Sequence, residues 1–148
     1  MFSSNRQQLR QFYFDVWTKM QKQQPLSALE QQLAQVIAAH PEYHPLLNHP
    51  EQLDQDYNLD EGNSNPFLHM GLHLALLEQV SNDRPQGIRA LYQQFLQHSN
   101  DWHQCEHQMM TPLAESIWQA QANNRPPSEQ DYLHALTTLL QRQTRSQS

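Results

Sequence analysis

The stretch from Asn65 to Val80 constrains the fold more than any other part of the chain. Asn65 is a favourable helix N-cap and Pro66 suits the first helical position, so the stretch is predicted to begin as a helix. A helix without a polar face has to be covered by its neighbours. We therefore expect a central helix that is the most buried of the chain. Its apolar residues are Phe67, Leu68, Met70, Leu72, Leu74, Leu76, Leu77 and Val80.

Two histidines, His69 and His73, interrupt this apolar stretch. They are four residues apart, so on a helix they lie one turn above each other on the same face. A buried imidazole without a polar partner is costly. The sequence therefore predicts that other polar groups, or a ligand, meet these two side chains.

The composition indicates an all-α fold in a single domain over residues 1–148, because the chain has only three glycines and many glutamines, which are fair helix formers. Apolar periodicity and capping signals predict a bundle of five to six helices. The acidic, aperiodic segment 46–64 is predicted to be one long, mostly irregular crossover loop. The expected helices cover residues 4–22, 27–40, 65–80, 84–97, 101–123 and 128–140.

The charge balance argues against nucleic acid as the main partner. The formal net charge is −6, and only nine lysines and arginines are available to meet phosphates. Cys105 is the only cysteine, which excludes an internal disulfide and fits a reducing compartment. No apolar run reaches transmembrane length and no signal-peptide core is seen at the start. We expect a soluble, cytoplasmic protein without a membrane partner.

Paired histidines are the strongest chemical signal in the sequence. Spacing by four places two imidazoles on one helix face, which suits two ligands of one metal ion. Two such helices packed face to face would offer four nitrogens inside a bundle, so His69 and His73 are expected to converge with the corresponding pair of the fifth helix. The pairs are His40 and His44, His69 and His73, and His103 and His107.

For His40 and His44, a role as metal ligands and a structural role are equally supported. Pro45 disfavours a helical conformation at His44, so the four-residue spacing does not show that the two side chains share a helix face. Carboxylates near the other pairs add ligand candidates, although each is slightly more consistent with a solvated or outer-shell group. Imidazole and carboxylate together favour a divalent transition metal, namely zinc, iron or manganese. The carboxylate candidates are Glu78, Glu106 and Glu115.

Five segments of the chain are distinctive as a set: HPEYH (40–44), NPFLHMGLHLALLEQ (65–79), DRPQGI (83–88), HQCEH (103–107) and LAESIWQAQ (113–121). In these segments the chain resembles an uncharacterised bacterial family, the domain of unknown function DUF1841. The resemblance covers most of the chain but implies no activity. More loosely, the paired histidines are similar to those of hemerythrin and DinB-type metal bundles, and the spacing of His73 and Glu78 is similar to the His-x4-Asp of hemerythrin; this is architectural analogy alone.

Three functions remain open from the sequence, which assigns no catalytic residue and does not decide whether the protein is an enzyme. The first is a helical-bundle protein that binds one or two transition-metal ions, with its role unknown. The second is a zinc hydrolase, since His103, Glu106 and His107 match the H-x-x-E-H motif in which the glutamate is the general base. The third is an interaction module without metal, which would bind another protein or a second copy of the chain.

Overall fold

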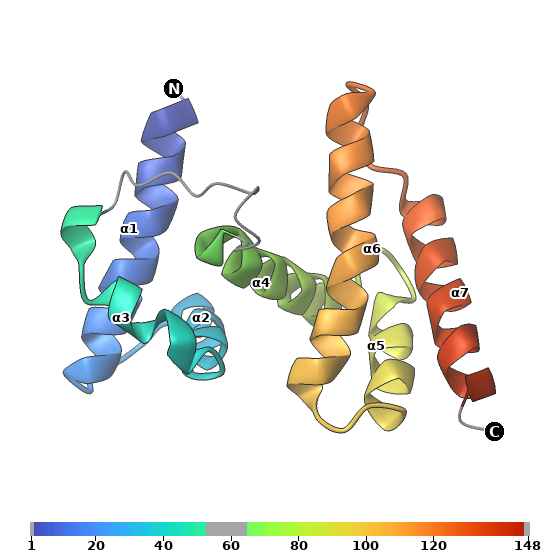
Figure 1. The fold of residues 1–148 in the computed structure, drawn as a ribbon, viewed down its shortest axis with the longest axis horizontal. Helices are drawn as coiled ribbons and strands as arrows, with labels where there is room; N and C mark the ends of the chain where they lie inside the picture. Colours follow the sequence, from blue (N-terminus) through green and yellow to red (C-terminus); the bar gives the residue numbers. More distant parts are fainter. Residues whose placement is uncertain (1, 53–64, 147–148) are drawn as a thin grey trace. The chain divides into compact units, whose positions relative to one another are not determined.

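All regular structure in the described part of the chain is helical. The computed structural model describes residues 2–52 and 65–146, and these contain seven α-helices and two short 3-10 helices (Figure 1). The chain divides into two compact units, Met1–Leu74 and Ala75–Ser148. The all-α prediction is confirmed, while the single domain over 1–148 stays a prediction.

The first unit begins with a helical hairpin whose ends are fixed by local signals. Ser27 and Glu30 form a reciprocal capping box at the start of the second helix: the Ser27 hydroxyl accepts from the Glu30 backbone N–H, and the Glu30 carboxylate accepts from the Ser27 N–H. Lys19 on the first helix also donates to Glu30, at 2.6 Å. The elements are α1 (Phe2–Gln21), α2 (Ala28–Ala38), η1 (Pro41–Tyr43), α3 (His44–Leu47), η2 (Pro50–Gln52) and the first half of α4 (Pro66–Asn82).

The core of this unit joins α1, α2 and the start of α4. The ring of Phe67 stacks on Tyr13 at 5.6 Å and meets Phe14 at 5.9 Å, while the Arg10 guanidinium lies 4.7 Å above it. Such a cation–π contact lets a buried arginine remain next to an aromatic core. The other buried apolar side chains are Val16, Leu33, Val36, Ile37, Leu47 and Met70.

The second unit contains the rest of α4 and three further helices, of which α6 and α7 run side by side in Figure 1. Asp101 caps α6 by accepting from the Gln104 N–H at 2.8 Å, and Ser128 accepts from the Asp131 N–H at the start of α7. The helices are α5 (Ile88–Gln97), α6 (Trp102–Ala122) and α7 (Glu129–Ser146). The buried apolar residues are Leu76, Ile88, Phe95, Cys105, Met109, Met110, Leu113, Tyr132, Leu136 and Leu140.

Helix α4 starts where the sequence predicts, but it is not covered on all sides. Its buried side chains recur every third residue, at Phe67, Met70, His73 and Leu76, whereas Leu68 is 55% exposed. The expectation that neighbours cover this helix on every side is therefore wrong at Leu68, while the expectation that it is the most buried helix stays a prediction. Apolar composition favours burial, but it does not decide which apolar residues of a helix find a neighbour.

The helix count differs from the prediction because residues 44–47 form α3. His44 has right-handed helical dihedral angles, and Pro45 lies in the first turn, where its missing N–H needs no partner. The prediction that Pro45 keeps His44 out of a helix is therefore wrong. Of the expected crossover segment 46–64, residues 46–52 hold the end of α3 and η2. The remainder lies outside the described residues, so the long irregular loop stays a prediction.

Within residues 2–52 and 65–146, no helix is both long enough and apolar enough to span a membrane.

The N-cap of α4 can be tested by substitution of Asn65. The Asn65 side-chain oxygen accepts from the N–H groups of Phe67 at 2.9 Å and Leu68 at 3.3 Å. Asn65→Ala removes this acceptor, and we expect a loss of about 1 kcal/mol in the free energy of unfolding measured with urea. Asn65→Asp keeps an acceptor at the same place and should be close to wild type. Equal losses in the two variants would contradict the capping role.

Candidate metal centre

The position of His40 is fixed by the carboxyl-terminal end of α2. The imidazole is buried, and its Nδ1 lies 2.8 Å from the carbonyl oxygen of Val36. A carbonyl can only accept, so Nδ1 carries the proton in this bond. In the neutral ring, Nε2 of His40 then carries the lone pair, and a neutral imidazole nitrogen of this kind can bind a metal.

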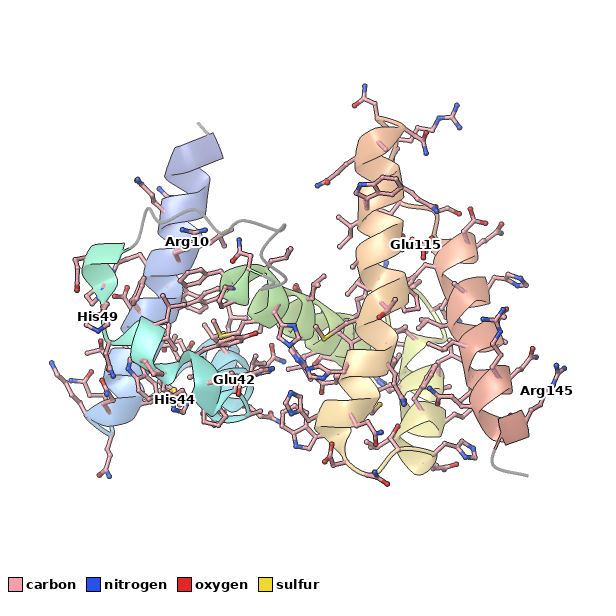
Figure 2. The ribbon with its side chains drawn as sticks, in the orientation of Figure 1. Arg10, Glu42, His44, His49, Glu115 and Arg145 are labelled. Carbon is pink, nitrogen blue, oxygen red and sulfur yellow. The ribbon has the colours of Figure 1, made fainter. Side chains whose placement is uncertain are left out.

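His44 makes a similar hydrogen bond to the next backbone carbonyl of α2. Its Nε2 donates to the carbonyl oxygen of Ile37 at 2.8 Å, and its ring lies against Trp17 with the centroids 4.4 Å apart. Figure 2 labels His44 in the first unit. The Val36 carbonyl near the end of α2 thus accepts from the His40 imidazole, and the Ile37 carbonyl accepts from His44 as well as from the backbone N–H of His40, at 3.0 Å. Of the two His44 nitrogens, Nδ1 is the one left for a metal.

Three imidazoles form a near-equilateral cluster in the first unit. The ring centroids of His40 and His69 are 4.9 Å apart, those of His40 and His73 are 4.7 Å apart, and those of His69 and His73 are 5.0 Å apart. His73 is fully buried and His69 is half-buried. The four-residue spacing on α4 therefore places both rings beside His40, as helical geometry requires. We call His40, His69 and His73 the histidine triad.

The closest contact in the triad joins the Nε2 atoms of His40 and His69, which are 3.1 Å apart. Because the neutral His40 ring carries its proton on Nδ1, His69 donates in this bond through Nε2–H. Tyr43 stacks on the His40 ring at a centroid distance of 5.3 Å and meets the edge of His69 at 6.1 Å. The triad is thus flanked by an aromatic ring on one side.

The second unit holds another histidine pair near the start of α6. The rings of His103 and His107 lie 4.2 Å apart at 60° to each other. His103 is half-buried and His107 is exposed. Each of these histidines offers a ring nitrogen, and the two nitrogens lie within 4.8 Å of each other. The same limit holds for the ring nitrogens of His40 and His73 in the first unit.

Glu106 stands on the buried side of the same helix. It is fully buried, and its Oε2 accepts from the Tyr92 hydroxyl at 2.8 Å. Burial, and next the charge of Glu106, raise the pKa of the Tyr92 hydroxyl well above its usual value. The same two causes raise the pKa of the Cys105 thiol to about 12. Cys105 therefore stays protonated at neutral pH, which disfavours it as a metal ligand.

The other two carboxylate candidates are exposed. Glu78 lies on α4, and Glu115 lies on α6, where its Oε1 accepts from Gln119 at 3.4 Å. Glu115 also lines a groove of about 430 Å³ between α6 and α7, whose other lining residues include Arg125 and Asp131. Figure 2 marks its place on α6. Exposed carboxylates of this kind are ordinary on helix surfaces.

The structure thus brings together His40, His69 and His73 within one unit, and His103 and His107 within the other. The convergence of both helical pairs in one cluster stays a prediction. The sequence supports a ligand role for His40 no more than a structural one, although in the structure its ring lies beside both His69 and His73. One signal for His40 was available, since it stands four residues after Val36 at the end of a predicted helix.

The chain belongs to the family described as Domain of unknown function (DUF1841), whose model matches residues 5–138. Neither the curated proteins nor the solved structures gave a match. The family membership predicted from the sequence segments is confirmed, and its description assigns no activity.

Two tyrosines in the second unit allow a paired test of the Glu106 contact. Tyr92 donates to the buried Glu106 carboxylate, and Tyr132 donates to the neutral Gln79 side chain, each at 2.8 Å. Because hydrogen bonds to charged groups are the stronger class, Tyr92→Phe should lower the free energy of unfolding by about 1.5–3 kcal/mol and Tyr132→Phe by about 1 kcal/mol. Urea unfolding of both variants measures the difference. A smaller loss of unfolding free energy for Tyr92→Phe than for Tyr132→Phe would show that Glu106 does not depend on its hydrogen bond with Tyr92.

Proposed function

We propose that the protein binds one or two transition-metal ions through its clustered histidines. The observation that carries the proposal is the histidine triad, in which three imidazoles lie with their centroids 4.7 to 5.0 Å apart. Imidazole is a preferred ligand of zinc and iron, and carboxylate is added in many sites that hold iron or manganese. The ion would be divalent, and its role is open.

The second histidine pair supplies the remaining nitrogens in this proposal. His103 and His107 either complete the coordination of one ion or hold a second, and the bound stoichiometry decides between these. Glu106, fully buried and bonded to Tyr92, stays a ligand candidate of lower rank. His44, Glu78 and Glu115 stay lower-ranked ligand candidates. The single cysteine supports a reducing, cytoplasmic location.

The hydrolase alternative has less support. A general base in the H-x-x-E-H motif has to reach a metal-bound water. Glu106 instead lies in the core of the second unit and accepts from the Tyr92 hydroxyl. The interaction module without metal is the remaining alternative, and the metal content separates it from the proposal.

Elemental analysis is the first test. Protein purified without a histidine tag, or reconstituted with zinc, iron or manganese and then desalted, should retain about one or two ions per chain. Retention should weaken in acid, because protons compete for the imidazole nitrogens. No stoichiometric metal after reconstitution with all three ions would reject the metal-binding function and favour the interaction module.

A double variant, His69→Ala with His107→Ala, removes one nitrogen from each cluster. We expect loss of most bound metal and a lower melting temperature in the presence of metal, because a ligand that binds only the folded state stabilises it. A matched control is His98→Ala with His134→Ala, which removes two histidines outside both clusters. Equal metal contents in the two double variants would contradict the assignment.

A further inference from the structure

We infer that the histidine triad is a metal site complete within residues 1–74, with three nitrogen ligands and a fourth position that takes a small anion. The inference rests on the proposed function and narrows it, because it assigns one ion to His40, His69 and His73 without ligands from the second unit. It also names the chemical class of the exogenous ligand.

The spacing of the nitrogens fits a shared ion. Zinc–imidazole bonds of about 2.0–2.1 Å at tetrahedral angles place neighbouring ligand nitrogens about 3.3 Å apart. The Nε2 atoms of His40 and His69 are already 3.1 Å apart. His73 offers a ring nitrogen within 4.8 Å of one on His40, and its ring centroid lies 5.0 Å from that of His69.

His40 has the outer-shell support that metal-bound histidines have. A ligating imidazole usually donates its other N–H to a carbonyl or carboxylate, which fixes the tautomer and the ring orientation. The bond from Nδ1 of His40 to the Val36 carbonyl, at 2.8 Å, is of this kind. Since Val36 is itself fully buried in the core, the Nε2 lone pair of His40 is directed before any ion binds.

Metal binding requires one proton to move. His69 donates its Nε2–H to His40 in the structure, so this proton occupies the space that the ion would take. For Nε2 of His69 to bind the ion, its proton leaves and Nδ1 gains one, which changes the tautomer without changing the charge of the ring. His69 is half-buried, so exchange with water can supply this proton.

The charge of the triad favours an anion at the fourth position. Three neutral imidazoles leave both positive charges of a divalent ion uncompensated. Zinc sites with three protein ligands keep the fourth position for water or substrate, in contrast to closed structural sites. A small inorganic anion or a carboxylate would supply the missing negative charge.

The first experiment asks whether the second unit is needed. In full-length protein, His103→Ala with His107→Ala should keep one equivalent of zinc or cobalt(II), with a Kd within about threefold of the corresponding wild-type site. The wild type binding metal while this variant binds none would overturn the inference and leave the proposed function standing. Absence of metal from the wild type would reject both.

The second experiment tests His69 as a ligand. His69→Gln should weaken cobalt(II) binding by more than about 100-fold, beyond the 10–100-fold effect of an outer-shell change. His49→Gln is the matched control, because His49 is exposed and pairs with Glu51 at 2.8 Å. Circular dichroism establishes that both variants fold. A loss of less than about tenfold for His69→Gln would exclude His69 from the ligand set.

Nitrogen NMR provides a readout in unaltered protein. Long-range ¹⁵N–¹H spectra should show His40 protonated on Nδ1 with and without zinc, and His69 shifting from an Nε2–H to an Nδ1–H tautomer on zinc addition. An unchanged His69 tautomer in zinc-loaded protein would overturn the assignment.

The fourth position is tested with azide. Cobalt(II) bound to the His103→Ala, His107→Ala variant should change its visible absorption spectrum on azide addition, in a saturable manner. A spectrum that azide does not change would show that the fourth position is closed and would overturn this part of the inference.

Discussion

The hydrogen bond from His40 to the Val36 carbonyl is the interaction on which the candidate centre depends. It forms because α2 ends at Ala38 and leaves carbonyls without helical partners. The end of α2 is itself held by Leu33, Val36 and Ile37 in the core, all fully buried. The packing of one apolar helix face thus sets the tautomer of a histidine that lies beyond the helix.

Helix α6 carries its histidines and its buried polar residues on different sides. His103 and His107 lie one turn apart on a side that solvent reaches, whereas Glu106 and Cys105 are fully buried in the second unit. Residues adjacent in sequence are about 100° apart on a helix, so neighbours such as Glu106 and His107 meet different surroundings. The H-x-x-E-H pattern alone therefore does not place its glutamate beside its histidines.

Local signals made most helices predictable, while the site depended on contacts between segments. The Ser27 capping box and the Asn65 cap act within four residues, so the sequence reveals them. The importance of His40 was not visible in the same way, because its contacts with His69 and His73 join residues about 30 positions apart. The burial of Glu106 was missed for a similar reason, since its partner Tyr92 lies on another helix.

An ion held by the triad would link two segments that the chain order keeps apart. His40 follows α2, and His69 and His73 lie on α4, so a shared ion closes a long loop of the chain. Closing a loop costs entropy that grows slowly with its length. Here the folded unit already holds the two segments in place, with Val36 and Phe67 buried in its core. Binding would therefore add stability with little rearrangement, about 2.7 kcal/mol when free metal is 100 times its Kd. A prearranged set of nitrogens of this kind favours metal retention over metal-driven folding.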